Sequence, residues 1–143
     1  MFDKEKIINE LQRAGIRLTP QRRAILDYLA TTDIHPNAQQ IFQEVQKTQP
    51  DISLATIYNT LNTLVRLGFL KMLELESGNH YETNLRQHIN LICNICGKIQ
   101  DMDGSLTINS AEVLRCFGFQ VLDSRMEYHG VCSACRGRQK RVP

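Results

Sequence analysis

The chain has 143 residues, of which 42% are hydrophobic, and a formal net charge of +2. This length suits one domain or two very small ones. No apolar run approaches the ~20 residues that span a bilayer, and the N-terminus lacks the apolar core of a secretory signal. The sequence therefore excludes a membrane-spanning protein and predicts a cytoplasmic one.

The first part of the chain predicts four helices. The first has apolar residues at helical spacing and ends near Gly15. The second opens at Thr19-Pro20, a cap followed by a first-turn proline. The third follows His35-Pro36, and the fourth runs from the cap Ser53 to Gly68. The stripe of the fourth helix that we expect to be buried consists of Leu54, Ile57, Leu61, Leu64 and Val65.

Two strand-like runs follow, residues 69–76 and 79–84, joined at the hairpin signal Ser77-Gly78. Helices followed by a two-stranded hairpin describe a winged helix-turn-helix. The polar face of the fourth helix contains no acidic residue, and the first 26 residues hold six Lys or Arg against three acids. This charge distribution favours a polyanionic partner. A winged helix that binds protein is the alternative.

Beyond a short linker at residues 84–87 the pattern becomes strand-like, with a helix near Ile108 to Cys116 and a further extended run over residues 119–132. We expect an α+β protein: a winged-helix DNA-binding domain over residues 1–84, then a small α/β dimerisation and metal-binding domain over residues 85–143. The second domain is too short, at about 50 residues, to bury a good core alone. A metal ion and a partner subunit are the expected supplements.

Four of the five cysteines form two CxxC pairs. In a reducing compartment this arrangement favours metal over disulfide, and four thiolates suit a closed tetrahedral zinc site rather than a catalytic one. A redox-active CxxC is the alternative. The fifth cysteine, Cys116, lies in an apolar stretch and is expected to be a buried thiol. The predicted zinc ligands are Cys93, Cys96, Cys132 and Cys135.

The segment from His88 to Asp101 predicts a hairpin around the first CxxC pair. If the chain is extended from His88 to Cys93, His88 and Asn90 share one face while Cys93 lies on the other. A turn centred between Ile95 and Cys96 places Asp101 opposite Asn90 on the returning strand. One hairpin could then hold a cysteine site on one side and an oxygen and nitrogen site on the other.

Together these motifs resemble the ferric uptake regulator (Fur) superfamily, and within it the peroxide-responsive repressors of the PerR type. The resemblance covers nearly the whole chain. It rests on RLTPQRRAILDYL, HPNAQQIF, SLATIYNTLNTLVRLGFL, HYET, HINLICNICGKIQDM and the final CSAC, in this order. It implies a metal-dependent DNA-binding transcriptional repressor, not an enzyme, that senses hydrogen peroxide through bound Fe²⁺. The alternative within this superfamily is an iron- or zinc-responsive repressor of metal uptake genes.

The resemblance also implies a regulatory site for Fe²⁺ or Mn²⁺, which falls on His35, Glu82, His88, Asn90 and Asp101. Family members commonly have histidine where this chain has Asn90. An amide offers a carbonyl oxygen but no imidazole, which disfavours Zn²⁺ or copper more than Mn²⁺ or Fe²⁺. An accessory metal site of some iron-responsive relatives is expected to be absent. The residues at its positions are Gln87, Ile89, Ile108 and Ser124.

The expected partner is double-stranded DNA, bound by a homodimer at a pseudo-palindromic operator with one recognition helix in each of two successive major grooves. The candidates for base contacts are Thr56, Tyr58 and Asn59, and those for phosphate contacts are Arg17, Arg22 and Arg23. We expect His80 and His129 to be surface or packing residues. From a different class, a zinc enzyme is disfavoured because the cysteine site has no vacant position.

Overall fold

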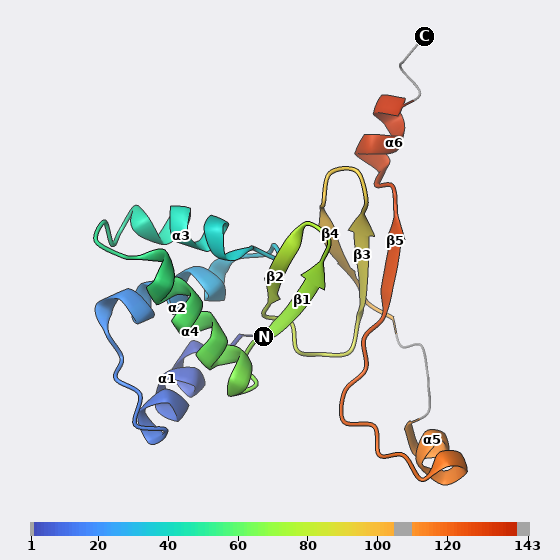
Figure 1. The fold of residues 1–143 in the computed structure, drawn as a ribbon, viewed down its shortest axis with the longest axis horizontal. Coiled ribbons are helices and arrows are strands. Elements are labelled where there is room, and N and C mark those ends of the chain that lie inside the picture. Colours follow the sequence, from blue (N-terminus) through green and yellow to red (C-terminus); the bar gives the residue numbers. More distant parts are fainter. Residues whose placement is uncertain (1, 105–109, 140–143) are drawn as a thin grey trace. The chain divides into compact units, whose positions relative to one another are not determined.

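The computed structural model describes residues 2–104 and 110–139. The chain divides between Leu85 and Arg86 into two compact units, here called the N-terminal and C-terminal units (Figure 1). Within the described residues, no helix combines the length and the apolar character needed to cross a membrane.

Four helices form the body of the N-terminal unit. Each begins at a polar side chain that accepts a hydrogen bond from a backbone N–H of its first turn, as predicted at Thr19 and Ser53. Asn37 and Gln40 add a reciprocal capping box at the start of the third helix, directly after His35-Pro36. The helices are α1 (Lys4–Arg13), α2 (Pro20–Thr31), α3 (Ala38–Gln46) and α4 (Leu54–Arg66).

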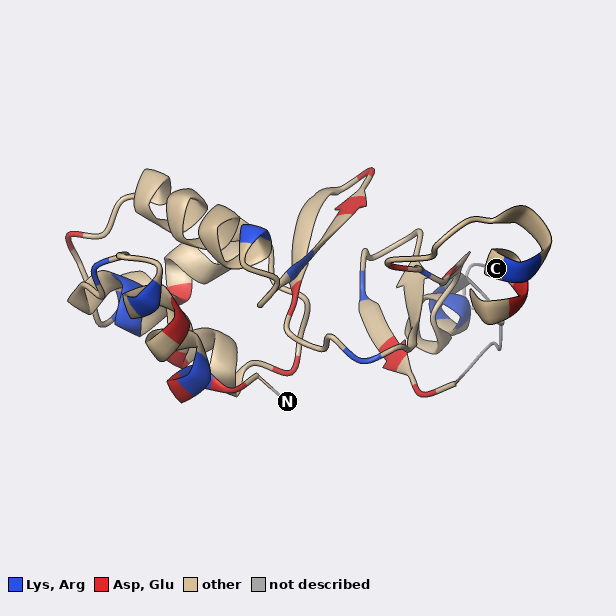
Figure 2. Ribbon diagram, turned by 90° about the horizontal axis from the view of Figure 1, so that it is seen from below, with Lys and Arg blue, Asp and Glu red and all other residues tan. Residues whose placement is uncertain are grey.

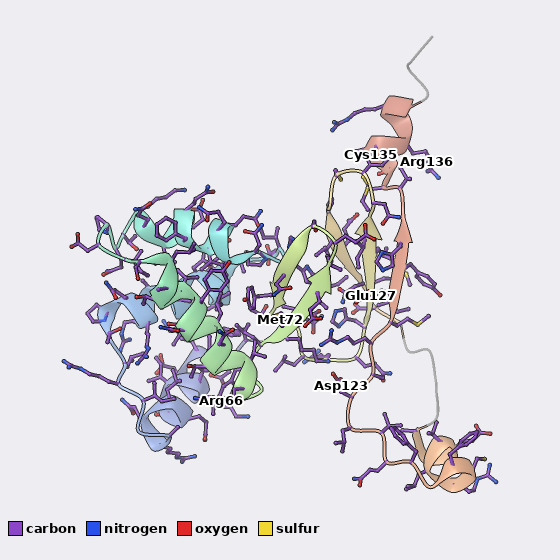
Figure 3. All side chains as sticks on the ribbon, in the orientation of Figure 1. Arg66, Met72, Asp123, Glu127, Cys135 and Arg136 are labelled. Carbon is purple, nitrogen blue, oxygen red and sulfur yellow. The ribbon has the colours of Figure 1, made fainter. Side chains whose placement is uncertain are left out.

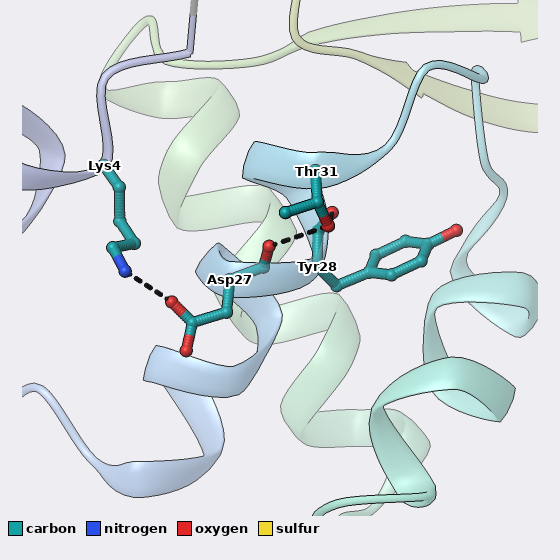
Figure 4. Close-up of polar contacts among 4 residues, drawn as sticks. All are labelled: Lys4, Asp27, Tyr28 and Thr31. Carbon is teal, nitrogen blue, oxygen red and sulfur yellow. Dashed lines mark hydrogen bonds and ion pairs between the residues drawn. The ribbon is translucent and has the colours of Figure 1, made fainter.

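The core of the N-terminal unit is apolar and centred on α4. Ile57, Leu61 and Leu64 are fully buried, as predicted, while Leu54 and Val65 pack at its margin. At the surface, α1 is joined to α2 by an ion pair between Lys4 Nζ and Asp27 Oδ1 at 2.7 Å (Figure 4). Exposed pairs of this kind contribute about 0–1 kcal/mol, so the apolar core supplies most of the stabilisation.

The predicted hairpin is present as β1 (Lys71–Leu75) and β2 (Gly78–Glu82), paired antiparallel. Gly78, with a φ of +111°, takes the left-handed backbone that the turn requires. The second strand also contacts the loop before α3, because the Tyr81 N–H donates to the Pro36 carbonyl at 2.9 Å. Helices followed by this hairpin make the N-terminal unit a winged helix.

The described residues of the C-terminal unit form a three-stranded sheet and two short helices. The central strand β3 (Ile89–Cys93) pairs antiparallel with β4 (Ile99–Met102) and parallel with β5 (Glu127–Gly130). Asn90 lies opposite Asp101, which confirms the predicted hairpin register. The two helices are α5 (Ser110–Phe117) and α6 (Ser133–Gln139).

Three details of the C-terminal unit differ from expectation. Residues 118–126 form no regular structure, so the extended run contains only the short strand β5. Cys116 is exposed rather than buried, because α5 buries none of its residues in this chain. Phe117, at the end of the same helix, is 81% exposed. Ile108, the expected start of this helix, lies outside the described residues.

The position of Leu61 at the centre of the helical core gives a test of the fold. Replacing it with alanine is expected to lower the free energy of unfolding by about 2–5 kcal/mol, since a cavity is left among residues that cannot collapse fully. The neighbouring Asn62 faces solvent, and Asn62→Ala is expected to change stability by no more than about 0.5 kcal/mol. Urea unfolding followed by circular dichroism measures both, and equal effects would contradict the assigned core.

Candidate metal sites

The four cysteines of the two CxxC pairs come together at one end of the three-stranded sheet. Their sulfur atoms all lie within 4.8 Å of one another. Cys93 ends β3, and the parallel pairing of Cys93 with Gly130 brings the chain that follows β5 alongside it. Cys132 lies in that following segment, and Cys135 lies on α6 (Figure 3). The crossover pairing of β5 with β3 thus closes a cluster whose halves are 36 residues apart.

The geometry of the cluster is that of metal ligands rather than disulfides. Cys96 Sγ and Cys132 Sγ are 3.8 Å apart, and all four thiols are free. A zinc tetrahedron with bonds of about 2.3 Å to sulfur has edges of about 3.8 Å, whereas a disulfide needs about 2.05 Å. The cluster therefore fits a structural zinc ion that is enclosed by four thiolates.

The backbone prepares part of the cluster for the thiolate form. The Cys132 N–H donates to Cys93 Sγ at 3.3 Å, and this bond is the largest of the effects that lower the pKa of Cys93 to about 6. Burial raises the pKa of Cys135 to about 12. A buried thiol of this kind ionises only beside a cation, so binding of zinc would displace its proton.

A second set of candidate ligands begins in the N-terminal unit with His35 and Glu82. His35 Nε2 lies 3.5 Å from Glu82 Oε1, and their side chains are 7% and 2% exposed. His35 comes from the loop before α3, and Glu82 is the last residue of β2. An imidazole beside a carboxylate in such dry surroundings is a common way to hold a divalent metal ion.

His80 has a positioning role here that the sequence did not indicate. It is buried, and its Nδ1–H donates to the backbone carbonyl of His35 at 2.7 Å. Because β2 alternates its faces, His80 lies on the same face as Glu82. A histidine two residues before a candidate ligand on one strand was the signal that could have identified it. Of the two predicted alternatives, surface or packing, His80 is the packing residue.

The C-terminal unit holds a similar pair. His88 Nε2 lies 3.9 Å from Asp101 Oδ2, and their side chains are 4% and 32% exposed. His88 Nδ1 is 2.7 Å from the Arg86 carbonyl, which can only accept, so the proton is on Nδ1. In the neutral ring the lone pair is then on Nε2, the nitrogen that faces Asp101. This arrangement resembles the outer hydrogen bonds that orient metal-binding histidines.

Asn90 lies beside this second pair, in the central strand. It is 6% exposed, and its side-chain oxygen accepts no hydrogen bond from the described residues. A buried amide oxygen without a donor is uncommon because it loses its hydration. Such an oxygen is available to a cation. His129 lies on the neighbouring strand and is half exposed.

The candidate DNA-contacting residues lie on α4 and around the start of α2. Tyr58 and Asn59 are exposed on α4, which contains no acidic residue, and Figure 2 shows blue basic residues on the helices of the N-terminal unit. Thr56, by contrast, is half-buried and belongs to the cap, because its N–H donates to Ser53 Oγ. Arg17 and Arg23 are exposed, whereas Arg22 donates to the Arg17 carbonyl at 2.6 Å.

A winged helix followed by a second unit with a four-cysteine cluster is the architecture of a class of metal-dependent transcriptional regulators. A sequence model of the ferric uptake regulator family matches residues 13–129. The chain belongs to the ferric uptake regulator family. Regulators of this family depend on metal and bind DNA as dimers.

Individual relatives agree with this assignment. The chain is 40% identical to the peroxide-responsive repressor PerR of Staphylococcus aureus over 137 residues, which cover 94% of this chain and 92% of that protein. The structure of PerR from Streptococcus pyogenes matches with 33% identity and a TM-score of 0.55, covering 94% of each chain. The ferric uptake regulator of Helicobacter pylori shares the fold, with a TM-score of 0.79, 24% identity, and coverage of 92% and 90%.

The cysteine cluster gives a test with an internal control. Cys135→Ser is expected to remove most of the zinc from the purified protein, because three thiolates no longer enclose the ion. Cys116→Ser, which alters a thiol outside the cluster, is expected to leave the zinc content unchanged. Elemental analysis after gel filtration measures both. Full zinc retention by Cys135→Ser would show that the cluster is not the site.

Proposed function

We propose that this protein is a DNA-binding transcriptional repressor that requires a regulatory divalent metal ion and is released from its operator by hydrogen peroxide. The single observation that carries the proposal is the presence of one imidazole-carboxylate pair in each unit, His35 with Glu82 and His88 with Asp101, in which both imidazoles and the Glu82 carboxylate are buried. The 40% identity to a peroxide-responsive repressor supports the choice of signal.

The regulatory ion would be held by His35, Glu82, His88 and Asp101, with the Asn90 oxygen as fifth ligand. A ligand set of two nitrogens and three oxygens favours Mn²⁺ or Fe²⁺, whereas softer ligand sets favour zinc or copper. An ion bound by pairs from both units would link the two units and fix the orientation of α4 relative to the C-terminal unit. If this coupling is about 1–3 kcal/mol, operator affinity changes about 5- to 150-fold on metal loss.

Fe²⁺ bound there would activate hydrogen peroxide, which would be reduced to water as a nearby imidazole is oxidised, whereas Mn²⁺ would support DNA binding without a response to peroxide. The residue that changes is His35 or His88, whose imidazole gains one oxygen atom while water is the other product. An oxidised ring is a poorer metal ligand. The four-cysteine cluster would keep its zinc throughout and take no part in the response.

The DNA contacts would come from α4, with Tyr58 and Asn59 aimed at base edges and Thr56 close to them. Asn59 has the donor and acceptor pair that recognises adenine. Arg17, Arg22 and Arg23 would contact phosphates and set the register. A DNA-binding role together with reduced cysteines fits the cytoplasm.

A second copy of this chain is the proposed partner for the C-terminal unit. Leu114, Phe117, Phe119 and Leu122 are exposed on and just after α5. Large neighbouring apolar side chains in water mark an association surface. Their burial against a second copy would supply the core that a unit of this size lacks, and would pair two α4 helices for two half-sites.

The peroxide response can be tested on the Fe²⁺-loaded protein. Brief exposure to hydrogen peroxide is expected to add one oxygen atom to the peptide carrying His35 or His88 and to weaken operator binding at least about 5-fold. Mass spectrometry of proteolytic peptides and a gel-shift assay measure the two effects.

The Mn²⁺-loaded protein is the control, and it is expected to remain unmodified and DNA-bound. Oxidation confined to cysteines, with operator release, would assign the signal to a thiol mechanism instead. Operator binding that follows Zn²⁺ at the second site, with no peroxide effect, would favour a repressor of metal uptake genes.

The base contacts can be tested at Asn59. Asn59→Ala is expected to cost about 1–3 kcal/mol of operator affinity and to relax discrimination at a single base pair. Asn9→Ala, an equivalent change at an exposed position of α1, is expected to leave both unchanged. Fluorescence anisotropy with operator variants at fixed salt measures the difference. An unaltered base preference in Asn59→Ala would remove Asn59 from the interface.

A further inference from the structure

Three polar residues form a row across the sheet of the C-terminal unit. Asn90 on the central strand β3 is in register with Asp101 on β4 and with Glu127 on β5. Residues paired in this way project from the same face of a sheet. Asn90 is therefore flanked by a carboxylate on either side, and only one of these, Asp101, belongs to the proposed regulatory site.

The amide of Asn90 has two different ends, and its neighbours distinguish them. An oxygen turned toward a carboxylate is repelled unless a cation lies between, whereas an NH₂ group turned toward a carboxylate donates a hydrogen bond. The His88 imidazole faces Asp101 at 3.9 Å, so the cation belongs on the Asp101 side. The NH₂ group is then best directed to the other side, where Glu127 lies.

Glu127 is held in place by a residue two positions along its own strand. Its carboxylate Oε2 accepts a hydrogen bond from His129 Nε2 at 3.1 Å. The Glu127 side chain is 26% exposed, which makes it a partly desolvated acceptor. Glu127 lies on β5, in the middle of the C-terminal unit (Figure 3). The pair formed by Glu127 and His129 thus presents a fixed negative group to the strand that carries Asn90.

We propose that Glu127 is a positioning residue for the regulatory metal site: when the ion is bound, its carboxylate accepts a hydrogen bond from Asn90 Nδ2 and turns Asn90 Oδ1 toward the ion. The inference rests on the proposed function, because it presupposes a divalent ion beside His88 and Asp101. It explains how an amide can serve where relatives commonly use imidazole. The amide is a weaker ligand, and a hydrogen bond to a carboxylate raises the electron density on its oxygen.

The test is a double-mutant cycle on the zinc-containing protein, with Mn²⁺ as the probe and the electron paramagnetic resonance signal of free Mn²⁺ as the readout. Glu127→Leu is expected to weaken Mn²⁺ binding about 10- to 100-fold. In the Asn90→Ala background the same change is expected to have less than about a 2-fold effect. Glu127→Gln keeps an acceptor oxygen and is expected to restore most of the affinity. Glu74→Leu, at an exposed strand position of the other unit, is the matched control.

The outcomes separate the inference from the proposed function. Equal losses from Glu127→Leu with and without Asn90, or a Glu127→Gln variant as weak as Glu127→Leu, would make Glu127 a direct ligand or a simple source of negative charge. No loss in Glu127→Leu would remove it from the site. Absence of Mn²⁺ binding in the parent protein would overturn the proposed function, and the positioning role with it. Unchanged zinc content and thermal unfolding in Glu127→Leu are required for the expected result, since they exclude a structural cause.

Discussion

The register of strand β3 is the constraint on which both groups of candidate metal ligands in the C-terminal unit depend. Its hydrogen bonds to β4 and β5 fix which residues stand opposite one another. This register places Cys93 in the cysteine cluster at the end of β3 and places Asn90 opposite Asp101. A shift of one residue would turn every side chain of the strand to the other face. The tetrahedral enclosure of a zinc ion by four thiolates would oppose such a shift, so zinc in the cysteine cluster would also preserve the geometry of the proposed regulatory site.

The local features of the fold were predictable from the sequence because they depend on neighbours along the chain. The caps at Thr19 and Ser53, the turn at Gly78 and the pairing of Asn90 with Asp101 are set by residues a few positions apart. The joining of β5 to β3 was not predictable, because a parallel pair over this separation has no local signal. The expectation that Cys116 is buried failed for a related reason. An amphipathic helix shows that it has an apolar face, but not whether its own chain covers that face.

The candidate ligands show the same difference between what the sequence indicates and what only the folded chain reveals. Residue type and the resemblance to a family identified His35, Glu82, His88 and Asp101, and the structure places them as two imidazole-carboxylate pairs, one in each unit. The groups that orient these ligands did not appear in the motifs. The bond from His80 to the His35 carbonyl and the bond from His88 to the Arg86 carbonyl are properties of the folded backbone. Loss of an outer group of this kind typically lowers metal affinity about 10- to 100-fold.

The crossover that brings β5 beside β3 also imposes an order on biosynthesis. Cys93 and Cys96 leave the ribosome well before Cys132 and Cys135, because Cys132 follows Cys96 by 36 residues. During that interval the first two thiols have no companions to complete a tetrahedron, and the exposed apolar side chains around α5 have no cover. Enclosure of a zinc ion by all four thiolates would therefore follow the synthesis of the second CxxC pair.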